Sequence, residues 1–199
     1  MKNHFKDNIK KLLGSCLIVF VITSCEYKDI ADAEYPNQTV YLPAARQEVY
    51  KIEKSVTDSD APVQYVLDKE NSKVILLMSV YRAGINNKGS VIADIVSDAK
   101  AVSDLITSGD LTTIHEDGTS STPILLPENK YTYAQTVEIK SGEETGSLEI
   151  MLDLPYLISY PHTRFAFAVK IADSNVSVNE KLATVIIDFN TKVLVPDSQ

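Results

Sequence analysis

Two histidines are the residues of this chain best suited to general acid–base chemistry. His115 stands in the polar run His115-Glu116-Asp117-Gly118, and His162 follows Tyr160-Pro161. A catalytic histidine needs a nucleophile or a reacting proton within hydrogen-bond reach. The sequence has no nucleophile elbow, no zinc-protease motif and no phosphate-binding loop. We therefore predict that both histidines are solvated or structural, with no catalytic residue and no cofactor.

Other side chains offer the chemistry of ligand binding. Tyr156, Tyr160 and His162 lie in a proline-flanked connection, where a flat ring can pack on a sugar and polar neighbours can bond its hydroxyls. We predict these three residues as a saccharide-binding patch, the alternative being rings that cap the core. Asp58-Ser59-Asp60 could offer oxygens to calcium, but the rest of a calcium-binding loop is missing, so no metal site is predicted.

The first 24 residues have the two parts of a secretory signal. Residues 1–11 carry four lysines and one aspartate, and residues 12–22 form an apolar run. The 13 residues from 12 to 24 would make a helix of about 20 Å, whereas a membrane span needs about 20 apolar residues. The sequence therefore predicts a signal peptide over residues 1–24 and no membrane-spanning helix.

The run Ile22-Thr23-Ser24-Cys25 resembles the bacterial lipobox. The resemblance implies that the Cys25 sulfur receives a diacylglycerol, that the chain is cut before Cys25, and that the new amine is acylated. Two or more acyl chains hold a protein stably at a membrane. Residues 25–38 would then be a lipidated tether, and the alternative is an ordinary signal peptide followed by a chance cysteine.

Acidic residues after Cys25 bear on which side of the membrane the protein faces. The run Glu26-Tyr27-Lys28-Asp29 resembles the surface-export signal of Bacteroidetes lipoproteins. It implies a lipid-anchored protein of the outer membrane, exposed at the cell surface. The alternative is a plain solvated linker, which would leave the protein on the periplasmic face.

The chain from Cys25 onward is acidic and has the size of one domain. The whole chain carries −8, and residues 1–24 carry +3, which leaves −11 for residues 25–199. Nucleic acids and anionic lipid headgroups are bound by patches of Lys and Arg, so no nucleic-acid partner is predicted. Cys16 falls in the signal and Cys25 is the acylation site, so no disulfide is expected.

Hydrophobic alternation predicts many short strands. They fall at residues 39–42, 48–52, 63–67, 73–83, 91–96, 131–140, 147–153, 164–171 and 183–189. Residues 73–83 are apolar on both parities, which predicts a central strand covered on both faces, with a buried helix as the alternative. Glycine-bearing turns at 84–89 and 142–146 predict two hairpins.

One segment breaks the period of two. Residues 98–108 place apolar side chains on one helical face, with Asp98 as the N-cap and Gly109 at the end. The sequence thus predicts the all-β class, as an antiparallel β-sandwich over residues 39–190 with one short crossing helix. Residues 191–199 are predicted to be a polar tail.

Several short segments occur in a characteristic order. They are Val40-Tyr41-Leu42-Pro43, then Leu126-Pro127 with Tyr131, then Val137-x-Ile139, the phenylalanine-rich strand at 164–171 and the closing strand at 183–189. This order is similar to the immunoglobulin-like domain of unknown function at the N-terminus of many Bacteroidetes surface lipoproteins. The resemblance covers about residues 39–190. It implies an immunoglobulin-like sandwich, often encoded beside starch-utilisation-type glycan uptake machinery.

Two functions remain open at this point. The first is a non-enzymatic binding accessory in glycan capture or uptake, attached to the membrane through its lipid, with a polysaccharide or outer-membrane uptake proteins as partners. The alternative is a structural spacer or subunit of a surface adhesive or outer-membrane assembly, in which an edge strand pairs with a partner strand.

Overall fold

The computed structural model describes residues 38–54 and 64–194 of the protein. They belong to the second of two compact units, Met1–Tyr35 and Pro36–Gln199. The predicted signal peptide, Cys25, nearly all of the tether and the Asp58-Ser59-Asp60 run lie outside the described residues. Within those residues, no helix has the length and apolar character needed to cross a membrane.

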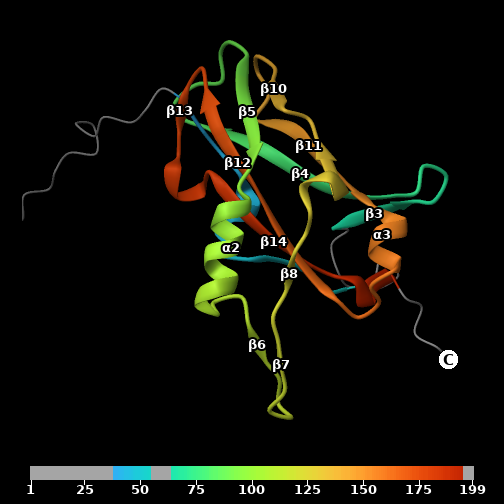
Figure 1. Ribbon diagram of the computed structural model, residues 1–199. Helices are drawn as coiled ribbons and strands as arrows, with labels where there is room; N and C mark the ends of the chain where they lie inside the picture. Colours follow the sequence, from blue (N-terminus) through green and yellow to red (C-terminus); the bar gives the residue numbers. More distant parts are fainter. Residues whose placement is uncertain (1–37, 55–63, 195–199) are drawn as a thin grey trace, which may run out of the picture. The chain divides into compact units, whose positions relative to one another are not determined.

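Two six-stranded sheets make up most of the fold (Figure 1). The first sheet consists of β1 (Thr39–Tyr41), β3 (Tyr65–Asp68), β4 (Lys73–Ala83), β9 (Tyr131–Tyr133), β11 (Thr145–Asp153) and β13 (Ser177–Val178). The second sheet consists of β2 (Tyr50–Ile52), β5 (Val91–Ser97), β8 (Ile124–Leu125), β10 (Thr136–Ile139), β12 (Arg164–Ser174) and β14 (Thr184–Asn190). The predicted all-β character is therefore confirmed.

Smaller elements connect and cover the sheets. They are the β6 (Thr113–Ile114) and β7 (Ser120–Ser121) hairpin, the α-helices α2 (Ala99–Ser108) and α3 (Leu154–Ile158), and the 3-10 turns η2 (Pro43–Arg46), η3 (Glu128–Lys130), η4 (Glu180–Leu182) and η5 (Thr191–Leu194). The last turn differs from the predicted polar tail. Thr191 and Val193 are buried, so the packed region extends beyond residue 190 to Leu194.

Strand pairing is mainly antiparallel, with parallel pairs of two or three residues. The longest pairing joins β4 to β11, from Lys73 opposite Asp153 to Tyr81 opposite Thr145. Three parallel pairs, β1 with β13, β2 with β14 and β8 with β12, depart from the predicted antiparallel arrangement. Each involves a short strand added beside a longer antiparallel pair, so local pairing geometry and not the hydrophobic pattern decides its direction.

One core is shared by the two sheets. Leu76 and Ile150 of the first sheet belong to the same buried cluster as Phe165, Phe167 and Phe189 of the second. In β11 and β12 the core side chains have the parity that the alternation predicts. The alternation of residues thus identifies the inward face of these strands correctly.

The two predicted hairpins are wrong. β4 and β5 flank the turn at residues 84–89, but β4 lies in the first sheet and β5 in the second. The strands that flank residues 140–144 are also in different sheets, since β10 lies in the second sheet and β11 in the first. Both loops cross from one sheet to the other. Glycine and asparagine mark where a strand ends, but which sheet receives the next strand depends on contacts far away in the sequence.

The prediction that strand 73–83 is covered on both faces is also wrong. Leu77, on the outer face of β4, is 45% exposed, and Met151 on the neighbouring β11 is 36% exposed. Strands β12 and β14 are buried on both faces. In β12, Arg164, Ala166 and Ala168 alternate with the phenylalanines and are also buried. Helix α2 covers the outer face of β12. The apolar residues on both faces of β4 do not by themselves reveal which strand a helix covers.

Helix α2 is confirmed where the sequence predicts it. The Asp98 carboxylate accepts a hydrogen bond from the Ala101 N–H at 3.0 Å, and Gly109 ends the helix with φ 86°. Val102 packs against Ala166 and Ala168 in a second apolar cluster. The two alanines let the helix approach the sheet closely, which explains why small residues occupy this face of β12.

The predicted single strand at 131–140 is divided between the sheets. Tyr131 and Tyr133 lie in β9 of the first sheet, and Val137 and Ile139 lie in β10 of the second. All four side chains are buried or half-buried, as the shared parity predicts. The segment therefore keeps one apolar face while its backbone passes from one sheet to the other.

Gly146 allows β10 and β11 to approach each other closely. A Cβ atom at this position would lie 2.8 Å from the Glu138 carbonyl oxygen and 2.6 Å from a methyl carbon of Val137. Gly146→Ala is expected to lower the free energy of unfolding by about 1–3 kcal/mol through overpacking. Urea unfolding measures this, with Ser147→Ala on the outer face as the control. Equal stability of the two variants would contradict the close approach.

Candidate functional site: a pocket at the loop after β4

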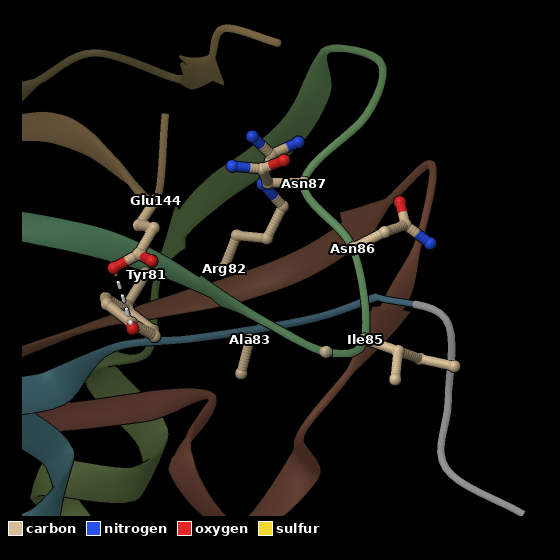
Figure 2. A pocket seen from close by; sticks show the side chains of 8 residues that line it. Tyr81, Arg82, Ala83, Ile85, Asn86, Asn87 and Glu144 are labelled. Atoms are coloured by element: carbon tan, nitrogen blue, oxygen red, sulfur yellow. Dashed lines mark hydrogen bonds between the residues drawn. The ribbon is translucent and has the colours of Figure 1, made fainter. Parts of the chain in front are cut away.

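A pocket of about 490 Å³ opens where β4 ends and the loop to β5 begins. Its lining comes from the last residues of β4, from the loop at 84–87, and from Glu144 just before β11. In Figure 2 the Tyr81 phenol and the Glu144 carboxylate point toward each other, and Ile85 and Asn86 project from the loop at the other end. Residues 63 positions apart are thus brought together by the pairing of β4 with β11.

Tyr81 is the aromatic side chain of this pocket. It lies on the outer parity of β4, opposite Tyr41 of β1, and the two ring centroids are 5.2 Å apart at an angle of 51°. The Arg46 guanidinium donates a hydrogen bond to the Tyr41 hydroxyl at 2.8 Å and lies 5.1 Å from the Tyr41 ring centroid. Tyr41 is buried, so it supports the half-exposed Tyr81 ring from one side.

Glu144 orients the Tyr81 hydroxyl. The phenol donates a hydrogen bond to the Glu144 carboxylate at 3.1 Å (Figure 2). This hydrogen bond, together with the negative charge of Glu144, raises the pKa of the Tyr81 phenol. Tyr81 therefore stays protonated in neutral solution, where it presents a neutral ring with a fixed hydroxyl.

Arg82 holds the loop and the β10–β11 connection together from within. Its side chain is 3% exposed, and its guanidinium donates to the carbonyl oxygens of Gly89, Lys140 and Glu143. Its Nε atom has no partner among the described residues. Buried polar groups are usually paired, so burying Arg82 with an unpaired Nε costs free energy of folding. Its three other hydrogen bonds fix the conformation of the loop.

Asn86 and Asn87 complete the loop, and each uses part of its side-chain amide for hydrogen bonds within the protein. Asn87 Nδ2 donates to the Gly142 carbonyl at 3.1 Å, and the Asn86 Oδ1 atom accepts from Gln38 at 3.0 Å. In the part of the chain that the structure describes, Asn86 Nδ2 and Asn87 Oδ1 have no partner. A flat ring beside amide and carboxylate groups is the arrangement that fits a sugar, with one apolar face and several hydroxyls.

The predicted patch of Tyr156, Tyr160 and His162 is divided in the structure. Tyr156 lies in α3, and its ring centroid is 5.7 Å from that of the core residue Phe165. Tyr160 follows the helix, is 44% exposed, and has its ring 5.1 Å from Tyr156. The two tyrosines therefore cap the Phe165 end of the core, with Tyr160 open to solvent.

His162 lies with residues that the sequence does not connect to it. It lines a pocket of about 380 Å³ together with His115, which comes from the β6–β7 hairpin. Neither Tyr156 nor Tyr160 is among the residues that line this pocket. Within residues 38–54 and 64–194, no group of three or more His, Cys, Asp or Glu side chains is placed to hold a metal ion.

Sequence reasoning misses Tyr81 and Glu144. A signal for Tyr81 exists, because it lies on the outward parity near the end of strand 73–83 and is followed within six residues by Asn86 and Asn87. No signal points to Glu144, because its position beside Tyr81 depends on the register of β4 and β11. Carboxylates are also too frequent in an acidic chain for one of them to be distinctive.

Solved structures of Bacteroides proteins are similar to this chain. A Bacteroides ovatus protein of unknown function is 13% identical with a TM-score of 0.50, over 78% of this chain and 52% of its own. A candidate carbohydrate-binding protein from the same species is 13% identical with a TM-score of 0.47, over 76% and 36%. An auxiliary nutrient-binding protein from Bacteroides thetaiotaomicron is 14% identical with a TM-score of 0.45, over 73% and 44%.

These likenesses concern the fold. The chain spans between 36% and 52% of the length of the three structures. Of the three, the structure with a TM-score of 0.50 indicates a similar fold. No protein family matches the sequence, and no curated protein does. The function therefore has to be argued from the residues of the pocket.

Proposed function

We propose that this protein is a non-enzymatic, lipid-anchored binding protein that captures a saccharide in the Tyr81 pocket. The observation that carries the proposal is the half-exposed Tyr81 ring, backed by Tyr41 and hydrogen-bonded to Glu144 beside two asparagines. The ring offers an apolar surface to one face of a pyranose. The amide and carboxylate groups accept and donate hydrogen bonds to its hydroxyls.

The charges of the pocket favour a neutral saccharide. Its lining has one carboxylate, Glu144, and one guanidinium, Arg82, so the formal charges cancel. The guanidinium is buried behind the loop and is already bonded to three carbonyl oxygens. A ligand with an acidic group would lie close to Glu144, and the lining residues provide no exposed cation to compensate its charge. The exposed Arg46 lies behind Tyr41, on the neighbouring strand side of the pocket.

The names of the structural neighbours are compatible with this proposal but do not support it. At 13% and 14% identity the neighbours named for carbohydrate and nutrient binding have TM-scores below 0.50. The immunoglobulin-like topology that the family resemblance implies is likewise part of the proposal. What the structure contributes is the two sheets, their shared core and the pocket at one loop.

A glycan array tests the proposed function. The full-length protein, purified in detergent, is applied to neutral plant and bacterial polysaccharides and their oligosaccharides. We expect binding to at least one class of neutral glycan, retained in a pull-down with the same polysaccharide. An absence of binding across all neutral glycans would overturn the proposal.

The anchor is proposed from the sequence alone, through the acylation of Cys25 at the outer membrane, with the bulk of the chain at the cell surface. Cys25→Ala is expected to abolish incorporation of labelled palmitate and to move the protein out of the membrane pellet, since the acyl chains supply the membrane affinity. Ser24→Ala keeps the small residue before the cysteine and is the matched control. Unchanged label and fractionation of Cys25→Ala would contradict the anchor, and protease treatment of intact cells tests which side the protein faces.

A structural role is the second candidate, and the outer face of the first sheet favours it. Val66, Ile75 and Met151 occupy one row across β3, β4 and β11, next to Leu77, and three of these four side chains are at least 36% exposed. Exposed apolar patches mark protein contacts. Crosslinking in intact cells tests this role, which predicts a recurrent crosslinked protein that is lost in Leu77→Glu.

A further inference from the structure

A second pocket lies at the opposite end of β12 from the Tyr81 pocket. Strand β12 begins at Arg164, which lines the second pocket, and ends at Ser174, whose hydroxyl donates to Ile92 next to the β4–β5 loop. We propose that this second pocket binds the carboxylate or sulfate group of an acidic saccharide, held by His115 and His162 in their protonated forms. The proposal does not depend on the Tyr81 pocket.

At the floor of this pocket Arg164 fastens the β6–β7 hairpin to the sheet. Arg164 is ion-paired with Asp188 on β14, and both side chains are buried. Its guanidinium also donates to the Ser121 carbonyl at 2.6 Å and to the Leu111 carbonyl at 3.1 Å, on the two sides of the hairpin. His115 is therefore carried by a hairpin with a fixed base.

His162 adopts a left-handed backbone conformation, with φ 56°. This conformation is uncommon for residues other than glycine, and histidine is among those that adopt it more often. The buried Thr191 locks the turn, because its hydroxyl donates to the Tyr160 carbonyl at 2.6 Å and accepts from the Thr163 N–H at 2.9 Å. The turn thus holds the exposed His162 imidazole at the pocket.

The charged groups around the two imidazoles set the pH dependence. Lys192 and Glu53 also line the pocket, and the charge of Arg164 is neutralised by Asp188. At the hairpin tip Glu116 and Asp117 adjoin His115 in the chain. The pKa of Asp117 is lowered chiefly by hydrogen bonds from Thr119 and to a smaller extent by the charge of His115. With neutral imidazoles the charges of the lining residues Lys192 and Glu53 cancel. Two protonated imidazoles add two positive charges to the lining, and the carboxylates of Glu116 and Asp117 at the hairpin tip lie on the His115 side of them.

The remaining lining fits the sugar ring of such a ligand. Thr113, Thr122 and Asn190 supply hydroxyl and amide groups, and Ile124 is 54% exposed and gives an apolar surface. Imidazolium and ammonium groups form charge-assisted hydrogen bonds with carboxylate and sulfate oxygens. The combination therefore suits an acidic group carried on a polyhydroxylated ring.

Calorimetric titration of the full-length protein in detergent tests the proposal at about pH 5.5 and about pH 8, between which histidine changes its charge. The probes are a galacturonic acid trimer, a sulfated disaccharide, a neutral trisaccharide and sodium sulfate. We expect one or both acidic saccharides to bind roughly 10-fold more tightly at the lower pH, as two added charge contacts allow. Which one binds identifies the acidic group.

The variant His115→Gln/His162→Asn is expected to lose this pH dependence, and asparagine tolerates the backbone conformation at residue 162. Lys181→Gln, outside the pocket, and Tyr81→Ala are expected to keep it, which separates this site from the Tyr81 pocket. No acidic saccharide bound at the lower pH would overturn the proposal, as would a pH dependence retained in the double variant. Sulfate ion bound as tightly as the saccharides would contradict a saccharide ligand.

Discussion

Replacing Asp188 by alanine is expected to lower the free energy of unfolding by about 3–5 kcal/mol, because the change leaves a buried arginine without its counter-charge. Asp188 is 1% exposed and Arg164 is 9% exposed. Arg164 Nε lies 3.2 Å and 3.3 Å from the two carboxylate oxygens of Asp188, and Nη2 donates to one of them as well. The same guanidinium also holds the β6–β7 hairpin, so hairpin and sheet are expected to be disturbed together.

Urea unfolding followed by circular dichroism measures this effect. The matched control is Asp104→Ala, which removes the exposed Lys100–Asp104 pair on α2 and should have a much smaller effect, because solvent screens this pair. The double variant Arg164→Met/Asp188→Leu removes both charges and should recover part of the loss. If Asp188→Ala and Asp104→Ala were equally stable, the buried pair would not have the role given to it here.

The elements whose residues are decided locally are those the sequence predicts best. Helix α2 has its cap, its apolar face and its terminal glycine within twelve residues, from Asp98 to Gly109. The alternation in β11 and β12 also depends on neighbouring residues alone, and it identifies the core side chains correctly. For such segments the local pattern and the tertiary contacts agree.

Contacts between distant segments account for what the sequence misses. The turn after β4 is recognisable, but its passage to the other sheet depends on the pairing of β5 with β10 and β12. Ala166 and Ala168 in the sequence do not indicate that a helix covers the outer face of β12, and only the packing of α2 on them shows it. In both cases hydrophobic periodicity does not tell which strand or helix lies beside the segment.

The same limit applies to the two pockets. The sequence predicts one patch of Tyr156, Tyr160 and His162 because these residues are close in the chain. In the structure α3 places the Tyr156 ring against Phe165. Tyr81 and Glu144 become neighbours through a nine-residue strand pairing, and His115 and His162 through the Arg164 anchor of the hairpin. Side chains that act together here come from segments that are far apart in the chain.

The second large effect concerns ligand binding by Tyr81. Tyr81→Ala removes the half-exposed ring and the hydroxyl bonded to Glu144, and we expect it to weaken neutral-saccharide binding by roughly 30-fold, the loss typical of a central aromatic contact. Tyr81→Phe keeps the ring and should lose much less. Tyr160→Ala is the matched control, because Tyr160 is a solvent-accessible tyrosine that, like Tyr81, packs on a second tyrosine ring.

Titration of the array-selected neutral oligosaccharide into the wild type, Tyr81→Ala and Tyr160→Ala is the most direct test of a saccharide site at the loop after β4. Circular dichroism spectra of the three proteins establish that each is folded. We predict that Tyr81→Ala loses the binding and that Tyr160→Ala stays within about threefold of the wild type. Binding that survives in Tyr81→Ala and disappears in Tyr160→Ala would contradict it, and would place the site at the end of α3.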